Sequence, residues 1–210
     1  MNYKRFILLS DYQTNCYLLW DEKSGESLLI DPADQSKEIK DFIEVKRLNL
    51  KYIVNTHGHG DHIGGNRYFK ELYPEAKIAI HSEDANFLLE PRLNLSQYFE
   101  VQIVSPSAEL ILEDGMEIQL GDQAIKVIHT PGHTKGGISL YTAPYLFSGD
   151  TLFAESVGRT DFPGGSFTTL SDSIKNKLFT LPEETEVFPG HGDFSTISEE
   201  KKFNPYVGEV

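Results

Sequence analysis

The feature that most constrains this chain is a group of three histidines and one aspartate within six positions, separated only by glycines. The group, His57-Gly58-His59-Gly60-Asp61-His62, follows the strand-like stretch 51–55 and is followed by Gly64-Gly65. Its spacing is too short for one face of a helix and too irregular for one face of a strand. It therefore predicts a loop folded around a ligand. Neutral imidazoles together with a carboxylate suit zinc, iron or manganese.

Other potential ligands occur singly along the chain, each next to a glycine and each after a strand-like segment. His133, Asp150 and His191 all come directly after a glycine. One such histidine alone is more often a surface residue than a ligand, but turns at strand ends can meet at one edge of a sandwich. Together they indicate a metal site and disfavour a histidine-rich surface loop. His81 and His129 also end strands, and we interpret them as hydrogen-bonded supporting groups.

Composition and charge narrow the class of protein. A chain of 210 residues with 39% hydrophobic and 24% charged residues is ordinary for a soluble globular protein. A formal net charge of −13 disfavours partners that are bound through phosphate charge, nucleic acids above all. The apolar run 6–9 is too short for a signal peptide, and no segment is long enough to span a membrane. We therefore expect a cytoplasmic protein with a small-molecule substrate and no membrane partner; the sequence leaves the oligomeric state open.

The single cysteine, Cys16, lies in a strand-like stretch between Asn15 and Tyr17. One cysteine cannot form a disulfide within the chain, and no two-cysteine zinc or redox motif occurs. We interpret Cys16 as a small buried apolar residue rather than a reactive thiol.

Strand-like and helical patterns occur in two similar halves, each with a sheet and its helices. Residues 82–108 have no clear assignment, and a flap over the site is one interpretation of them. The pattern predicts an α/β fold in which two sheets form a sandwich with helices outside, in a single domain over 1–210. Strands are expected over 3–9, 16–20, 27–30, 51–55, 77–80, 109–112, 117–120, 124–128, 138–141, 145–148 and 186–188, and helices over 39–48, 66–72 and 170–178 and from 198.

Taken in order, the glycine-framed motifs resemble those of the metallo-β-lactamase superfamily, and within it the single-domain bacterial type of glyoxalase II-like (hydroxyacylglutathione hydrolase-like) hydrolases. The resemblance covers nearly the whole chain. It implies a four-layer αββα sandwich of two mixed β-sheets, without the separate C-terminal helical domain of full-length glyoxalase II enzymes. The motifs that carry it are Thr56–Gly65, Thr130–Thr134, Ser148–Phe153, Gly158–Gly165 and Pro189–Gly192.

The resemblance also implies a site for two divalent metal ions, zinc by first choice, with iron or manganese as alternatives. Such a pair can lower the pKa of a shared water and polarise a substrate carbonyl. Asp61 and Asp150 would be catalytic, Asp61 by orienting the shared water. Outer carboxylates or carbonyls should orient the ligand imidazoles, and Thr134 and Thr151 are further candidates for that role. The implied ligands are His57, His59 and His133 for one ion, Asp61, His62 and His191 for the other, and Asp150 as a bridge between them.

The reaction that the resemblance implies is hydrolysis of an acyl thioester, S-D-lactoylglutathione or a related one. The candidate substrate contacts are Phe153, Arg159, Asp161 and Phe162. Full-length glyoxalase II enzymes present a lysine and a tyrosine to glutathione where this chain has Arg159 and Asp161. Arg159 keeps a positive charge for a substrate carboxylate, but pairing with Asp161 is an equal alternative.

Three other classes remain as alternatives. A persulfide dioxygenase-like oxidoreductase with one iron shares the stretch 158–162, and lactonases of the superfamily have a similar ligand set. A non-catalytic scaffold with a metal-stabilised fold is the third. Aspartate at position 150, where β-lactamases of the superfamily usually have cysteine, disfavours antibiotic hydrolysis as the main role.

Overall fold

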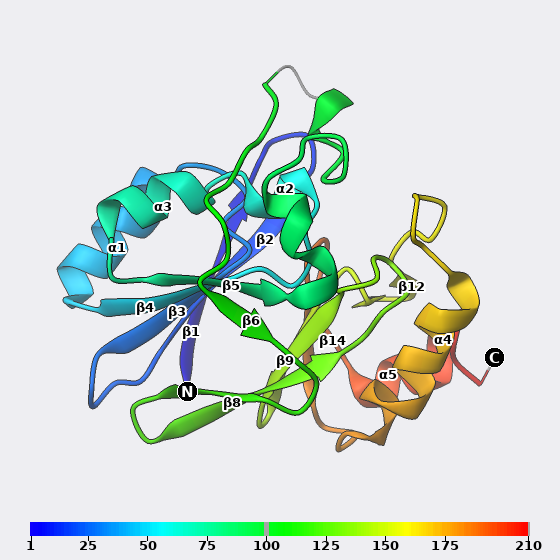
Figure 1. Ribbon diagram of the computed structural model, residues 1–210. Coiled ribbons are helices and arrows are strands. Elements are labelled where there is room, and N and C mark those ends of the chain that lie inside the picture. Colours follow the sequence, from blue (N-terminus) through cyan, green and yellow to red (C-terminus); the bar gives the residue numbers. More distant parts are fainter. Residues whose placement is uncertain (99–100, 210) are drawn as a thin grey trace.

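The computed structural model describes residues 1–98 and 101–209, and places two six-stranded sheets face to face with helices on the outer faces (Figure 1). In the first sheet the strands follow one another in chain order. The first three are antiparallel, and the others are parallel. They are β1 (Asn2–Leu8), β2 (Thr14–Trp20), β3 (Glu26–Ile30), β4 (Asn49–Val54), β5 (Lys77–His81) and β6 (Leu110–Leu112).

The second sheet is also mixed, because β10 and β13 pair in parallel while its other neighbouring strands are antiparallel. A separate hairpin, β11 (Leu152–Phe153) with β12 (Ser156–Val157), follows β10. The strand order of the sheet is β14 (Ser195–Thr196), β13 (Glu186–Pro189), β10 (Tyr145–Gly149), β9 (Ile138–Thr142), β8 (Gln123–His129) and β7 (Glu117–Leu120).

The helices are short, and several begin with a side-chain cap. In the first, the Ser36 hydroxyl accepts a hydrogen bond from the Ile39 amide, and Arg47 ends the helix in the left-handed conformation. None of the described helices is long and apolar enough to cross a membrane. The α-helices are α1 (Lys37–Lys46), α2 (Gly60–Ile63), α3 (Asn66–Leu72), α4 (Phe167–Asn176) and α5 (Ile197–Phe203); the 3-10 helices are η1 (Ser82–Leu88), η2 (Ser96–Tyr98) and η3 (Leu178–Thr180).

Apolar side chains form three layers between the four layers of secondary structure. Alternating residues of β2 supply two of them, because Leu18 faces helix α1 and Leu19 faces the second sheet. The third layer contains Leu146 of β10 and Leu170 of α4. Cys16 is fully buried in the first layer, as expected. The predicted four-layer sandwich of two mixed sheets is thus confirmed.

Some predicted boundaries are wrong. The predicted loop 56–65 contains one helical turn, α2, because the His62 amide donates to the His59 carbonyl 3.0 Å away. Leu48 lies beyond helix α1, since the chain reverses at Arg47, and Leu178 belongs to η3 rather than to α4. Within 82–108, the described residues form two 3-10 helices and connecting turns.

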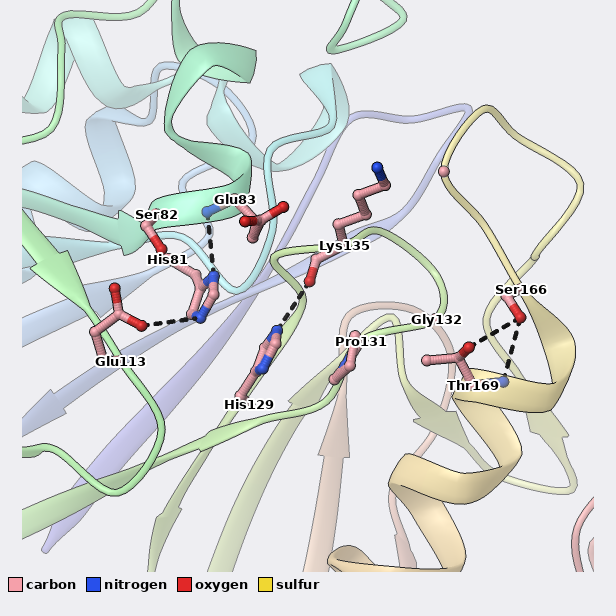
Figure 2. Close-up of a pocket in the computed structure, with 11 residues that line it drawn as sticks. His81, Ser82, Glu83, Glu113, His129, Pro131, Gly132, Lys135, Ser166 and Thr169 are labelled. Carbon is pink, nitrogen blue, oxygen red and sulfur yellow. Dashed lines mark hydrogen bonds and ion pairs between the residues drawn. The ribbon is translucent and has the colours of Figure 1, made fainter.

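His81 and His129 line a cavity of about 520 Å³ together with Pro131, Gly132 and Lys135 (Figure 2). Their rings stack with centroids 4.0 Å apart. His81 Nδ1 accepts a hydrogen bond from the Glu83 amide, and His129 Nε2 lies 2.8 Å from the Lys135 carbonyl oxygen. Both are therefore hydrogen-bonded, as we expected of supporting groups.

Candidate metal centre

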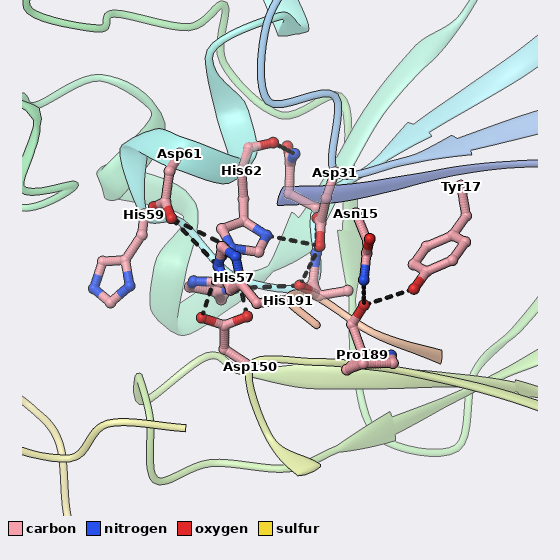
Figure 3. A network of polar contacts seen from close by, with 12 residues as sticks. Asn15, Tyr17, Asp31, His57, His59, Asp61, His62, Asp150, Pro189 and His191 are labelled. Atoms are coloured by element: carbon pink, nitrogen blue, oxygen red, sulfur yellow. Dashed lines mark hydrogen bonds and ion pairs between the residues drawn. The ribbon is translucent and has the colours of Figure 1, made fainter. Parts of the chain in front are cut away.

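The seven predicted ligands meet at one edge of the sandwich. Figure 3 labels all of them except His133. Strand β4 ends three residues before His57, β10 ends at Gly149, and β13 ends at Pro189, so the residues that follow three strand ends lie at the same place. The turn α2 then separates Asp61 from His59 along the chain and directs it to the other half of the site. Strand ends and one helical turn thus build the centre.

The donor atoms fall into two groups that could each hold a metal ion. In the first group, made of His57, His59 and His133, His59 Nδ1 lies 2.9 Å from His133 Nε2. In the second, made of Asp61, His62 and His191, the two Nε2 atoms lie 3.2 Å apart. Two ligands on a tetrahedral zinc ion with bonds of about 2.05 Å are separated by about 3.3 Å, so both spacings are compatible with a shared ion.

Asp150 lies between the two groups. Its Oδ2 is 3.6 Å from His133 Nε2 in the first group, and 3.5 Å from His191 Nε2 in the second. Its Oδ1 is 3.5 Å from His62 Nε2. One carboxylate therefore faces both groups, and the six histidine and aspartate ligands together with Asp150 fit a binuclear site.

Two buried atoms of the centre have no hydrogen-bond partner among the described residues: His57 Nε2 and Asp150 Oδ1. An unsatisfied polar atom in the interior is costly, so such atoms call for an explanation. Both are Lewis-base atoms directed into the space between the donor groups, where a cation would satisfy them. The residues present therefore fit divalent metal ions.

Four of the imidazoles are oriented in the same way, with Nδ1 bonded outward and Nε2 facing the centre. Three of the outer partners are carboxylate or carbonyl oxygens, as expected: Asp31 for His62 at 3.0 Å, the Arg159 carbonyl for His133 at 2.6 Å, and the Tyr12 carbonyl for His191 at 2.9 Å. The fourth, Thr56, lies 3.2 Å from His57 Nδ1. Such outer partners fix the tautomer and the ring orientation of metal-binding histidines.

The expectation that Thr134 and Thr151 orient ligand rings was wrong. Thr134 donates its hydroxyl hydrogen bond to Asp84, and the Thr151 hydroxyl lies 3.0 Å from that of Thr130. Both hydroxyls are therefore occupied by partners other than the ligand imidazoles.

Asp31 is a buried residue of the site that the sequence did not reveal. Besides contacting His62, its carboxylate accepts hydrogen bonds from the amide of Thr56 at 2.7 Å and from the Thr56 hydroxyl at 2.6 Å. Asp31, His57 and His62 also lie close enough together to form a third possible metal-binding group. Hydrogen bonds already occupy both oxygens of the Asp31 carboxylate, however. A signal exists in retrospect: Asp31 directly follows β3, a strand that runs parallel to β4 and ends beside the histidine run.

Asp84 is a second buried acid that the sequence did not reveal. It accepts hydrogen bonds from the Gly58 amide at 3.0 Å, the Thr134 hydroxyl at 2.7 Å and the Gly136 amide at 2.8 Å. Burial raises the pKa of Asp84, although these hydrogen bonds oppose the shift. Its carboxylate joins the loop of His57 and His59 to the loop of His133, and so holds the first donor group together.

Glycine is required at one position because the backbone passes directly beside the donors. A Cβ atom on Gly190 would lie 2.2 Å from Asp150 Oδ1 and 2.8 Å from His62 Cε1. Only a residue without a side chain leaves that space open. A larger residue at position 190 would therefore displace the donor side chains Asp150 and His62.

The two donor groups differ in their electrostatics. Burial lowers the pKa of His57, and burial with the neighbouring His133 lowers the pKa of His59 to about 3, so both rings are neutral at pH 7. Burial also acts to lower the pKa of His62, but Asp150, Asp61 and Asp31 outweigh it and raise the value to about 10. The carboxylates of the second group therefore favour a positive charge there, which a metal ion would supply as a proton does.

A cavity of about 420 Å³ opens above the centre, a size typical of small-molecule sites. Five donor residues form what we call the floor: His59, Asp61, His133, Asp150 and His191. Six other residues form what we call the rim: Tyr12, Leu95, Tyr98, Phe153, Arg159 and Phe162.

Three of the four predicted substrate contacts are on the rim: Phe153, Arg159 and Phe162. Asp161 does not line the cavity. Its carboxylate instead accepts two hydrogen bonds from the Arg159 guanidinium, at 3.0 and 2.7 Å. Of the two roles left open for Arg159, the structure shows the pairing with Asp161.

Sequence reasoning missed the other three rim residues. Tyr12 lies in the turn between β1 and β2, while Leu95 and Tyr98 come from the segment 82–108. That segment therefore contributes to the wall of the cavity. No spacing pattern marks these residues, since they reach the site through the course of loops.

Comparison with known proteins places this arrangement in a family. The sequence profile of the metallo-β-lactamase superfamily matches residues 9–191. A relative from Haemophilus influenzae named hydroxyacylglutathione hydrolase GloC is 34% identical over 209 residues, which cover 96% of each chain. A probable metallo-hydrolase, YqgX of Bacillus subtilis, is 34% identical over 93% of this chain and 92% of its own.

Solved structures agree with the sequence relatives. The BLEG-1 B3 metallo-β-lactamase superposes with a TM-score of 0.91 at 34% identity, covering 98% of this chain and 99% of that one. TTHA1623 in a di-iron-bound form superposes with a TM-score of 0.82 at 33% identity, covering 96% of this chain and 99% of that one. ETHE1 from Myxococcus xanthus superposes with a TM-score of 0.80 at 30% identity, covering 98% of this chain and 84% of that one. With its fold, its donor groups and these relatives, the chain belongs to the metallo-β-lactamase superfamily.

Proposed function

We propose that the protein hydrolyses acyl thioesters with two bound metal ions, in the manner of a glyoxalase II. The observation that carries the proposal is the meeting of two donor groups, with Asp150 between them, at the floor of a cavity of about 420 Å³. The relative named hydroxyacylglutathione hydrolase supports a thioester and makes S-D-lactoylglutathione the first substrate to test. Zinc is our first choice, and the di-iron-bound neighbour supports iron as the alternative, with manganese third.

The residues of the chain divide the work between holding ions and handling the substrate. Bound ions would supply a Lewis acid for the substrate carbonyl and a water of lowered pKa. Asp61 lines the cavity, and its carboxylate can accept a hydrogen bond from the attacking water and direct the water at the acyl carbon. The holding residues would be His57, His59 and His133 for one ion, Asp61, His62 and His191 for the other, and Asp150 for both.

The net reaction needs no serine or cysteine nucleophile. A bond forms between the water oxygen and the acyl carbon, the bond between that carbon and sulfur breaks, and the products are a carboxylate, a thiol and a proton. The rim residues Phe153 and Phe162 stand next to the floor and can shield the acyl group from bulk water.

Replacing the residue between the two groups tests the proposal. Asp150→Ala should lower kcat/KM for thioester hydrolysis at least about 100-fold, more than the loss of an outer partner causes, and should lower the number of bound ions. Elemental analysis and steady-state kinetics measure the two effects. Asp172→Ala, which removes an exposed acid from α4, is the matched control. Unchanged hydrolysis by Asp150→Ala would rule out the two-metal mechanism.

A persulfide dioxygenase with one iron is the second candidate, favoured by the similarity to ETHE1. The two candidates differ in what they consume. We expect hydrolysis without oxygen uptake, because the second donor group is complete. Oxygen consumption with a persulfide substrate, at one iron per chain, would replace the thioesterase proposal. Hydrolysis of a lactone, assayed in parallel, tests the lactonase alternative.

A further inference from the structure

The rim of the cavity is apolar over most of its extent. Tyr12, Leu95, Tyr98, Phe153 and Phe162 come from four separate segments of the chain and surround the approach to the donors. Phe162 packs edge-on against His59 with ring centroids 5.6 Å apart, and Phe153 lies 6.2 Å from the ring of His191. Aromatic walls on both sides of the donors favour an apolar group next to the reacting carbon.

Among the described residues that line this cavity, the single lysine or arginine is already paired with a carboxylate. Arg159 donates from both Nε and Nη2 to the two oxygens of Asp161, and its guanidinium lies 4.3 Å from the centroid of the Phe162 ring. Asp161 raises the pKa of Arg159, and Arg159 lowers that of Asp161, so both stay charged. A substrate carboxylate would have to replace Asp161 in a bidentate pair, exchanging one carboxylate for another.

A smaller cavity of about 270 Å³ adjoins the first and shares His59, Leu95 and Phe162 with it. It contains Arg92 and Glu90, so its charged residues are of opposite sign. Glutathione carries two carboxylates and one ammonium at neutral pH. The described residues of the two cavities form no cluster of cations that could receive such a molecule.

On the basis of the thioesterase function proposed above, we infer that the site selects thioesters by an apolar acyl group, aryl or branched alkyl, and does not recognise the carboxylates of the thiol carrier. The acyl group lies against Phe162, Phe153 and Tyr98. The Arg159–Asp161 pair closes one side of the rim and leaves the thiol portion directed toward solvent.

A panel of four thioesters tests the two parts of this inference separately. Phenylacetyl and D-lactoyl groups are each joined to N-acetylcysteamine, a neutral thiol, and to glutathione. We expect kcat/KM to be at least about tenfold higher for phenylacetyl than for lactoyl on either thiol, because the phenyl ring is removed from water. The two thiols should differ by less than about threefold for the same acyl group, the scale of one exposed ion pair.

Two variants test the masking of Arg159. Asp161→Asn should raise the ratio of kcat/KM for phenylacetylglutathione to that for the N-acetylcysteamine thioester about threefold, because Arg159 is then free to pair with a carboxylate of glutathione. Asp172→Asn makes the same charge change at an exposed position on α4 and should leave the ratio as it is. Asp161 is exposed, with a side-chain accessibility of 65%, so its replacement leaves the folded core intact.

The outcomes distinguish this inference from the proposed function. A preference for D-lactoylglutathione over both phenylacetyl thioesters, or an unchanged thiol ratio in Asp161→Asn, would overturn the inference and leave the thioesterase proposal standing. No hydrolysis of any of the four by the metal-loaded protein would overturn the proposed function and the inference with it.

Discussion

The floor and the rim of the cavity are held in place by different means. On the floor, the rings of His133 and His191 are each fixed from outside by a backbone carbonyl, and Asp150 has a side-chain accessibility of 11%. On the rim, Tyr98 is 80% exposed, and the Arg159 side chain is 67% exposed. The floor is therefore rigid because many buried contacts determine each side chain, while the rim depends on a few surface contacts.

This difference separates chemistry from selectivity. Buried groups that are hydrogen-bonded from outside the centre cannot change position without breaking those bonds, so a change on the floor should affect kcat. Exposed aromatic side chains can be exchanged at low cost, so a change on the rim should affect KM and the choice of substrate. The following substitutions test that separation.

The largest effect is expected from a methyl group placed against the floor. Gly190→Ala would bring a Cβ to 2.2 Å from Asp150 Oδ1, so the carboxylate must move. A displacement of about 1 Å at reacting groups costs about 100-fold in rate, and we expect at least that loss in kcat, with fewer ions bound. Kinetics and elemental analysis provide the measurement.

Gly192→Ala is the matched control for that substitution. Gly192 has a φ of +78° and nothing within 4 Å of an added Cβ, so alanine there strains the backbone without touching a donor. If Gly190→Ala kept kcat within about threefold of the parent, the floor would be more adaptable than its buried contacts indicate.

A smaller effect, confined to one donor group, is expected from Asp84→Asn. An amide offers one acceptor oxygen where the carboxylate accepts from Gly58, Thr134 and Gly136. The affinity for one of the two ions should fall about tenfold, and the other should stay unchanged, because Asp84 joins only the loops of the first group. Competition with a chelator measures both affinities.

Glu83→Gln, an exposed neighbour on η1, is the control for the charge change. Equal weakening of both ions by Asp84→Asn would show that the two donor groups respond as one unit. That outcome would contradict the assignment of Asp84 to the first group.

The sequence predicted the floor better than the rim for a physical reason. Ligands such as His133 and His191 lie beside glycines at strand ends, and that local pattern can be recognised without knowing the fold. Asp31 and Asp84 were not predicted because each accepts hydrogen bonds from residues that are distant in the chain. Thr56 is 25 positions from Asp31, and Thr134 is 50 positions from Asp84. A single acid has no spacing that marks such a role.

The layers of the fold were predictable because alternation in strands and spacing in helices are local properties. The turn α2 was not, because four residues rich in glycine and ligands carry no helical periodicity. The rim is harder still, since Tyr12 and Tyr98 are brought together only by the course of two loops. Selectivity therefore rests on the part of the molecule that sequence patterns describe least.

The smallest effect is expected on the rim itself, from Phe162→Leu. Leucine keeps an apolar side chain but loses the edge contact with His59 and the face on which Arg159 lies. An aromatic pair contributes about 0.5–1.5 kcal/mol beyond area burial, so KM for an apolar thioester should rise about threefold while kcat stays within about twofold. Phe167→Leu replaces an exposed phenylalanine at the start of α4 and should change neither constant. A loss in kcat as large as that of Gly190→Ala would mean that Phe162 positions His59, so that the rim also determines the geometry of the floor.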